Sequence, residues 1–469
     1  MDTTQCLIPY IKTLSGDRDT PITLYERYVK EAPGFLLESK DPIRGRFSFI
    51  SKYPKTIIKG CGTKLSIFNE GNEVNLTGNS LDLIKNYLSN YLVENKSNIP
   101  FIGGAVGMIA YDIVKQHEKL PTTNMDTLKL PDIHLMVVKE VIVYDHFHSQ
   151  IHLVVLEENS ELGKHRGLSR LKAIEKELST QLNSSSTLDK TTPTLNVIEN
   201  LDSFKYEFIE KVNKAKDYIK EGDIFQVVLS QRWCVETNKK PFTLYRQLRE
   251  INPSPYLFYF NFGDYQLVGS SPEMLVEVRG DNVYTCPIAG TRKRGKTKEE
   301  DEYLKEELLN DYKERAEHVM LVDLARNDMG RISKIGSVKV TNFMDVHNYS
   351  HVMHIVSTVE GIKKETEDSF SILSHFLPAG TLSGAPKIRA MEIIEELEEE
   401  KRGPYGGAVG YFSFDGDLDM CIAIRTMVIK ENKVFLQAGA GIVADSIPEN
   451  EYEECKNKIQ SLVKAIEFC

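Results

Sequence analysis

Short β-rich segments separated by turn residues dominate the sequence from Phe35 to about Glu158. Two clear examples run from Leu135 to Tyr144 and from Ile151 to Leu156. Runs of this length, rich in β-branched residues and interrupted by Gly, Pro and Asn, are typical of strands joined by turns. This part of the chain is therefore predicted to form an antiparallel sheet.

Beyond this region helices and strands alternate irregularly. Residues 157–200 change to a charged helical pattern and then to a polar run, which predicts a first region at 1–182, a linker at 183–200 and a second region at 201–469. A helix is expected from Phe204 to Glu221, ending at Gly222. Expected strands follow it at Ile224–Val235, Leu257–Phe262 and Leu267–Gly269. This order favours an α+β fold over a doubly wound parallel sheet.

Composition narrows the function classes. The 469 residues include 58 Lys and Arg against 68 Asp and Glu, a net charge of −10. An acidic balance argues against nucleic acid or an anionic membrane as the main partner, whereas a small anion could still bind a local basic patch. The 7 cysteines contain no CxxC pair, and no apolar stretch exceeds about 11 residues. A soluble cytoplasmic protein is expected.

Three short motifs match known sites but lack the required context. Residues 290–297 fit the phosphate-loop pattern GxxxxGK[ST], yet the period of apolar residues from Asp301 to about Asn327 predicts a helix where that fold needs a strand. Residues 439–444 fit GxGxxA, but the one helix that follows, near Pro448, cannot complete a βαβ unit. The serine of 380–384 is one place late for a nucleophile elbow.

Two ExxE pairs and one histidine are candidates for chemistry. Glu314 with Glu317, and Glu451 with Glu454, each place two carboxylates on one helix face and could together hold one Mg²⁺. The pattern alone favours solvent-exposed faces, with Glu314 and Glu317 pointing away from a stripe of Leu308, Tyr312 and Ala316. The acidic cluster 392–400 is interpreted as solvent-exposed.

His354 lies in a strand-like stretch and shares its face with Val352 and Val356. A proton-transfer role is possible, although a core histidine is the commoner outcome for such a pattern. Gly439–Gly441 could bring backbone N–H groups to a carboxylate, and Arg425 could grip one with its guanidinium, with tight turns and a surface arginine as the alternatives.

Several longer motifs together resemble the chorismate-utilising enzymes, and within that family the component I chains of anthranilate synthases. The motifs follow a fixed order over nearly the whole chain, at Cys286–Arg292, Glu317–Asp328, Gly380–Lys387 and Gly439–Gly441. The resemblance implies a fold of two packed, mostly antiparallel β-sheets flanked by helices. It also implies a Mg²⁺-dependent lyase and reverses the interpretation of the glutamates and His354.

The resemblance implies a role for each site residue. Glu317 and Glu454 would bind Mg²⁺, with Glu314 and Glu451 assisting them. His354 would transfer protons, and Thr381 beside it would orient the leaving group. The carboxylates and ring of chorismate would be held by Gly290, Thr291, Tyr405, Arg425, Gly439, Ala440, Gly441 and Lys458.

The implied reaction is attack of ammonia at ring C2 with loss of the 4-hydroxyl, followed by elimination of pyruvate to give anthranilate. Two residues separate the family's reactions. Isochorismate and salicylate synthases carry a water-activating lysine at the place of Gln226, and a glutamine cannot act as that base. Aminodeoxychorismate synthases typically carry a nucleophilic lysine at the place of Ala289.

Regulation and partners are also implied. Ser39, Pro255, Tyr256 and Leu257 resemble a tryptophan feedback site, although relatives often have methionine at the place of Leu257. Ammonia would come from a glutamine amidotransferase subunit, component II, so a hetero-oligomer is expected. The alternatives are aminodeoxychorismate synthase component I, a relative that releases the aminodeoxyisochorismate intermediate, or a module that binds chorismate or tryptophan without turnover.

Overall fold

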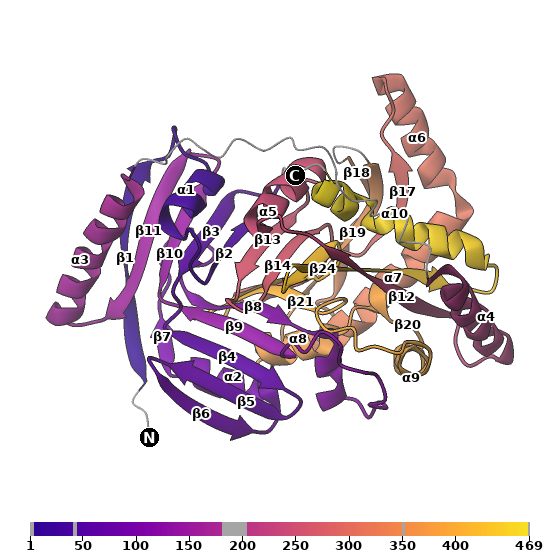
Figure 1. Ribbon diagram of the computed structural model, residues 1–469, viewed down its shortest axis with the longest axis horizontal. Coiled ribbons are helices and arrows are strands. Elements are labelled where there is room, and N and C mark those ends of the chain that lie inside the picture. The colour runs from indigo at the N-terminus through magenta and orange to yellow at the C-terminus, as the bar shows by residue number, and fades with distance from the viewer. Residues whose placement is uncertain (1–3, 41–44, 181–203, 349–351, 468–469) are drawn as a thin grey trace.

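Two β-sheets stacked face to face between helices form the centre of the molecule (Figure 1). The computed structural model describes residues 4–40, 45–180, 204–348 and 352–467. The predicted linker at 183–200 lies outside these residues. The α+β prediction, with two packed and mostly antiparallel sheets flanked by helices, is confirmed.

The first sheet contains 12 strands of the described chain. In spatial order they are β20 (Gly384–Ala385), β12 (Gln226–Glu236), β24 (Lys433–Ile442), β23 (Thr426–Lys430), β14 (Gln266–Ser271), β13 (Tyr256–Asn261), β2 (Gly34–Glu38), β3 (Phe47–Lys52), β10 (Glu140–Asp145), β11 (Gln150–Glu158), β1 (Gln5–Ser15) and β7 (Tyr91–Val93). Only the pair β1–β7 is parallel in this sheet of the described chain. Strands from the first and second regions of the sequence, 1–182 and 201–469, meet where β13 pairs with β2.

The second sheet also contains 12 strands of the described chain. They are β17 (Ile288–Lys293), β19 (Val352–Ile362), β16 (Asn282–Thr285), β15 (Met274–Arg279), β22 (Leu418–Ile422), β21 (Ala408–Ser413), β8 (Gly104–Ile109), β9 (Ile133–Val138), β4 (Thr56–Cys61), β5 (Lys64–Asn69) and β6 (Asn72–Thr77), with β18 (Lys339–Asn348) paired to β19. Here β21 pairs with β8. Each sheet thus combines strands from both parts of the sequence.

Alternating side chains build a core on both faces of each sheet. On β13, Phe258 and Phe260 point into the core between the sheets, whereas Leu257 and Tyr259 pack under helices on the outer face. On β9, Met136 faces the same inner core and Leu135 the helices of the second sheet. The period of two along each strand therefore produces a layered arrangement of helices, sheet, sheet and helices.

The helices cover the outer faces. They are α1 (Pro21–Tyr28), α2 (Ser80–Leu88), α3 (Glu161–Leu178), α4 (Lys205–Glu221), α5 (Pro241–Ile251), α6 (Lys298–Asn310), α7 (Tyr312–Ile332), α8 (Ser369–Phe376), α9 (Lys387–Leu397) and α10 (Pro448–Glu467). Figure 1 shows α1 and α3 at one end of the molecule and α7 and α10 at the other. No helix in the described ranges is long and apolar enough to cross a membrane.

The predicted β-rich run Leu135–Tyr144 spans two strands, β9 and β10. Two sequence-based predictions need correction. The helix expected from Asp301 breaks at Asp311, whose side chain accepts hydrogen bonds from the N–H groups of Lys313 and Glu314 and so caps α7. The expected apolar stripe is also wrong, because Tyr312 is 88% exposed and His318 lies on the buried face.

Phe260 belongs to the inner core, where it is fully buried with its ring 5.3 Å from that of Phe262. We therefore expect its replacement to have a large effect on stability. Phe260→Ala should lower the free energy of unfolding by about 3–5 kcal/mol through lost burial and the cavity left behind. Phe147→Ala, at a side chain that is 79% exposed, is the matched control and should change it by less than about 0.5 kcal/mol. Equal shifts of the urea midpoint in the two variants would contradict this assignment of the core.

Candidate functional site

Carboxylates from α7 and α10 converge at one end of the sheets. Glu314 and Glu317 lie in the first two turns of α7, and Glu451 and Glu454 in those of α10. Although solvent reaches Glu317, partial burial and the charges of Glu314 and Glu454 raise the pKa of its carboxyl. Burial and Glu454 also raise the pKa of Glu451. The structure therefore brings the two predicted ExxE pairs together.

Positive charges partly offset this cluster. Arg292, at the end of β17, donates to Glu314 Oε1 over 3.1 Å and to Asp311 Oδ2 over 2.8 Å, which fixes the start of α7 beside the strand. On α10, Lys458 Nζ lies 2.7 Å from Glu454 Oε1. The electrostatic repulsion among the carboxylates is thus only partly relieved by protein groups.

The donor set suits a hard dication. No group of three or more His, Cys, Asp or Glu side chains in the described ranges is arranged to hold a metal ion. Mg²⁺ commonly uses one or two carboxylates and completes its shell with water and ligand anions, so a preformed cluster of three is not required. The carboxylates that raise each other's pKa are the groups whose repulsion a bound cation would relieve.

The glycine-rich segment 439–441 lies inside β24, so the alternative of a tight turn is wrong. β23 pairs with β24 only as far as Leu436, whereas β12 pairs with it as far as Ile442. One edge of residues 437–442 therefore has no strand neighbour among the described residues. Lys458 Nζ approaches this segment and donates to the Gly439 carbonyl over 2.9 Å.

Side chains crowd the same glycines. A Cβ atom on Gly439 would lie 2.8 Å from the Tyr405 hydroxyl, and one on Gly441 would lie 2.6 Å from Gln226 Nε2. Contacts this short exclude a larger residue unless its neighbours move. Tyr405 and Gln226, which are far apart in sequence, therefore both border the β24 segment.

His354 lies on β19 opposite Thr291 of β17, and the two strands fix its ring. Its Nδ1 lies 2.9 Å from the Gly290 carbonyl oxygen and 3.0 Å from Thr291 Oγ1. A carbonyl only accepts, so Nδ1 carries the proton and Nε2 is the basic nitrogen of the neutral ring. Burial and the nearby charge of Arg425 lower the pKa of His354 and keep the ring neutral.

Glu273 is a site residue that the sequence analysis missed. It is 8% exposed in the turn between β14 and β15, and burial raises its pKa to about 7, although Thr381 and Lys458 both lower it. The Thr381 hydroxyl is close enough to Glu273 for that effect, yet has no hydrogen-bond partner of ordinary geometry among the described residues. The sequence signal that could have identified it is a single acidic residue at the end of the segment Ser270–Glu273, between two apolar strands.

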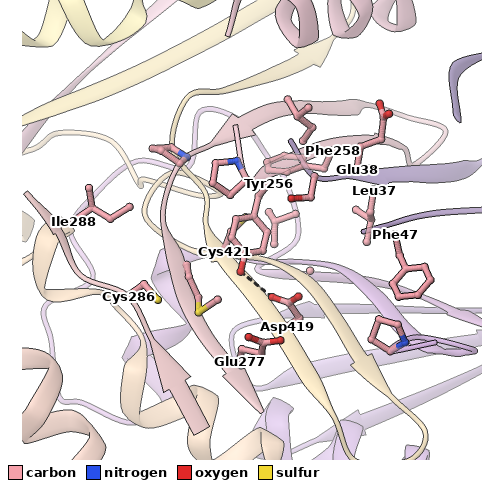
Figure 2. A pocket seen from close by; sticks show the side chains of 18 of the residues that line it. Leu37, Glu38, Phe47, Tyr256, Phe258, Glu277, Cys286, Ile288, Asp419 and Cys421 are labelled. Atoms are coloured by element: carbon pink, nitrogen blue, oxygen red, sulfur yellow. Dashed lines mark hydrogen bonds between the residues drawn. The ribbon is translucent and has the colours of Figure 1, made fainter. Parts of the chain in front are cut away.

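The residues of the expected effector site line a separate cavity of about 360 Å³ between the sheets. Ser39, Pro255, Tyr256 and Leu257 all contribute to its wall. Figure 2 shows Tyr256 pointing across the cavity to Asp419, with Ile288 and Cys286 on one side and Leu37 and Phe47 on the other. The Tyr256 hydroxyl donates to Asp419 Oδ1 over 3.0 Å.

Two further expectations are settled by position. The phosphate-loop pattern begins in β17, a strand paired with β19, and the residues where that fold needs a second strand lie on helices α6 and α7, so the rejection of that motif is correct. The acidic cluster 392–400 is not uniformly solvent-exposed, because Glu395 is 4% and Glu398 6% exposed. They are buried in ion pairs with Lys115 and Arg402 respectively.

Comparisons with known proteins agree with these features. The family model described as "chorismate binding enzyme" matches residues 36–464. The chain is 50% identical to anthranilate synthase component 1 of Acetivibrio thermocellus, over 98% of this chain and 95% of that protein. It is 45% identical to the component 1 protein of Thermus thermophilus, over 98% of each.

Solved structures share the fold. Anthranilate synthase component I from Streptococcus pneumoniae superposes with a TM-score of 0.80 at 41% identity, covering 90% of this chain and 93% of that one. The menaquinone-specific isochorismate synthase of Escherichia coli has a TM-score of 0.72 at 20% identity, covering 99% and 95%. At that identity the second match concerns the fold alone.

The raised pKa of Glu273 predicts a pH-dependent stability. The folded protein keeps this proton up to about pH 7, whereas the unfolded chain releases it near the ordinary glutamate pKa of 4.5, so stability from this group is lost as pH rises between those values. Glu273→Gln stays neutral throughout. Its stability relative to the unmodified protein should therefore rise by up to about 3 kcal/mol between pH 4.5 and pH 8.

Urea unfolding of both proteins across this pH range measures the difference. Glu300→Gln, at an exposed residue of α6, is the control and should show no such trend. A constant difference between Glu273→Gln and the unmodified protein would contradict the assignment.

Proposed function

This chain belongs to the chorismate binding enzyme family, and we propose that it is the ammonia-dependent component I of an anthranilate synthase, converting chorismate and ammonia to anthranilate and pyruvate. The observation that carries the proposal is a buried acid, Glu273, whose pKa is raised to about 7 by burial and which lies close to Thr381 and Lys458. Near-full-length identity of 45–50% to component 1 proteins supports the same reaction. Ala289 and Gln226 argue against the aminodeoxychorismate and isochorismate reactions.

Substrate binding is assigned to the cationic and backbone groups of the site. Chorismate carries two carboxylates, and positive charge is supplied by Arg425 near His354 and Tyr405 and by Lys458 at the open edge of β24. Backbone N–H groups of Gly439 and Gly441, and the Tyr405 hydroxyl beside Gly439, add donors that a desolvated carboxylate needs, while Ala440 between them pairs with Leu229 of β12 and holds the segment in place. Gly290 and Thr291 would complete the binding surface next to His354.

Glu317 and Glu454 would hold Mg²⁺ directly, with Glu314 and Glu451 placing water molecules around it. A bound Mg²⁺ would neutralise the ring carboxylate and stabilise charge that develops as the hydroxyl leaves. The mutual repulsion of these glutamates supports this assignment, since it gives them affinity for a cation. Arg292 would keep Glu314 in place through their 3.1 Å hydrogen bond.

The protein groups can perform the main proton transfers. Glu273 is protonated below about pH 7 and could donate its proton to the departing 4-hydroxyl, which leaves as water, with Thr381 orienting that group. Ammonia would form the new C–N bond at C2, and the proton that the resulting ammonium group loses would restore the acid form of Glu273. His354 Nε2 could then accept the C2 proton as the bond between the ring and the enolpyruvyl oxygen breaks, which makes the ring aromatic. The released enolpyruvate would take up a proton at its methylene carbon and become pyruvate.

The ammonia would be supplied from glutamine by a separate amidotransferase subunit, so the working enzyme would be a hetero-oligomer. Free ammonium salts should replace that partner in vitro. We place the enzyme in the cytoplasm. There it would catalyse the first committed step of tryptophan biosynthesis. The thiols of Cys6, Cys61, Cys234, Cys421 and Cys455 are free, which fits a reducing compartment.

The inter-sheet cavity would bind tryptophan as a feedback inhibitor. Its aromatic walls and its charged end, which includes Glu277 and Asp419, suit an aromatic amino acid. Val356 and Thr358 of β19 line it, and His354 lies two residues earlier on the same face of that strand. A ligand in the cavity would thus contact the strand that positions His354, which gives the two sites a physical connection.

The central experiment is incubation of the purified chain with chorismate, Mg²⁺ and ammonium at mildly alkaline pH, followed by anthranilate fluorescence and product mass. Anthranilate and pyruvate should form, and EDTA should abolish them. Glu273→Gln should still bind chorismate, but its kcat should fall by about 100-fold or more, as expected for a lost general acid. Aminodeoxychorismate or aminodeoxyisochorismate would overturn the assigned reaction, and absence of turnover would favour a binding module.

Filling the cavity should weaken feedback. Val409 lines the cavity and is 1% exposed, so Val409→Phe should occupy space that tryptophan needs. We expect the tryptophan concentration for half-inhibition to rise about tenfold or more, equivalent to about 1.4 kcal/mol of binding free energy. Calorimetric titration with tryptophan checks binding directly. Unaltered tryptophan affinity in this variant would contradict the placement of the inhibitor.

A further inference from the structure

Arg402 is a fully buried arginine directly behind the candidate active site. Its side chain is 1% exposed and forms an ion pair with Glu398, four residues earlier in sequence, across 2.6 Å. Burying two charges costs several kcal/mol per ion, and their attraction often does no more than offset that cost. The pair is therefore poorly explained as a source of stability alone.

The Arg402 guanidinium hydrogen-bonds to two backbone segments that carry site residues. It donates to the Leu382 carbonyl over 2.6 Å, and Leu382 follows Thr381 in the 3₁₀ turn η3 (Gly380–Leu382). It also donates to the Val228 carbonyl over 2.7 Å on β12, two residues from Gln226. One planar group thus fixes the distance between the Thr381 turn and the strand of Gln226.

Two aromatic rings complete its surroundings. The guanidinium carbon lies 5.7 Å from the ring centre of Tyr405 and 4.7 Å from that of Tyr111. Tyr405 in turn places its hydroxyl beside Gly439. Arg402 therefore also contacts the residue proposed to bind substrate at the open edge of β24.

Glu398 holds the guanidinium in this orientation. Its two oxygens accept from Arg402 Nε over 2.8 Å and from Nη2 over 2.6 Å. Glu398 Oε1 also accepts from the N–H and the hydroxyl of Ser230, over 2.8 and 2.9 Å, so it is anchored to β12. A bidentate pair of this kind fixes direction as well as distance, which an ammonium group cannot do.

We propose that Arg402, oriented by Glu398, is a positioning residue that sets the relative placement of Thr381, Gln226 and Tyr405 for the reaction. It touches no substrate atom and acts through these three neighbours. The inference rests on the proposed function, because it concerns residues of that site. A displacement of the Thr381 turn would alter the environment of Glu273 and reduce turnover.

Arg402→Lys tests the proposal, because lysine keeps the charge but cannot bond to Glu398, Leu382 and Val228 in one plane. We expect kcat/KM for chorismate to fall about 10- to 100-fold, the size associated with a misplacement of about 1 Å. Since Thr381 lowers the pKa of Glu273, loosening the turn should also move the basic limb of the kcat profile to higher pH. A merely structural role would not move that limb.

Arg170→Lys is the matched control. Arg170 forms an equally bidentate pair with Glu140, over 2.6 and 2.8 Å, on α3 at the opposite end of the molecule (Figure 1). This variant should retain kcat/KM within about twofold and keep the basic limb in place, because this half-buried pair contacts no described residue of the candidate site. Similar losses in both variants, or unaltered kinetics in Arg402→Lys, would overturn the proposal.

Glu398→Gln guards against misfolding of the arginine variant. Glutamine keeps the shape of the side chain but gives up one of the two bonds to Arg402, so a smaller loss of about 3- to 10-fold is expected with the same shift of the basic limb. Unaltered kinetics in this variant would overturn the role assigned to the pair. An unmodified protein that makes no anthranilate would instead refute the proposed function, so the two failures are distinguishable.

Discussion

The contact between the inner faces of the two sheets is the constraint on which the rest of the molecule depends. Aromatic and aliphatic residues of β13, β3, β8, β9 and β21 fill this layer, and it fixes the separation of the two sheets. Where the side chains pack completely, the layer is a dry core. Where their packing is incomplete, a cavity of about 360 Å³ remains. The same two sheets extend to the end where α7 and α10 bring their carboxylates together. Both proposed ligand sites therefore belong to one framework.

The candidate active site combines groups that oppose folding when considered separately. Glu317 and Glu451 are held near other carboxylates, and Glu273 and Arg402 are buried. Each is tolerated because rigid strands or helices hold it in place and large apolar cores supply compensating stability. Such arrangements are common at functional sites, where charge placement takes precedence over local stability. The electrostatics thus support the same location as the sequence motifs do.

Local features of the fold could be predicted from sequence, whereas its long-range pairings could not. The end of α4 at Gly222, whose φ is +87°, and the alternation around His354 follow from short-range rules. The pairing of β13 with β2 does not, because a period of two assigns faces but no neighbour. Glu395 and Glu398 were misinterpreted because their partners, Lys115 and Arg402, are not evident in a glutamate-rich segment. Glu273 was missed because a single acid between apolar strands gives no recurring pattern.

Because each sheet contains strands from both regions of the sequence, the sheets also limit the order in which the chain can fold. Strands β2 and β8 are synthesised early, yet β13 and β21, which pair with them, lie more than about 200 residues later. Until those partners leave the ribosome, each early half-sheet presents an unpaired edge and an uncovered apolar face. Both sheets are then completed by the same late part of the chain. Assembly of the inner core is consequently a late event in biosynthesis, and the candidate active site cannot precede it.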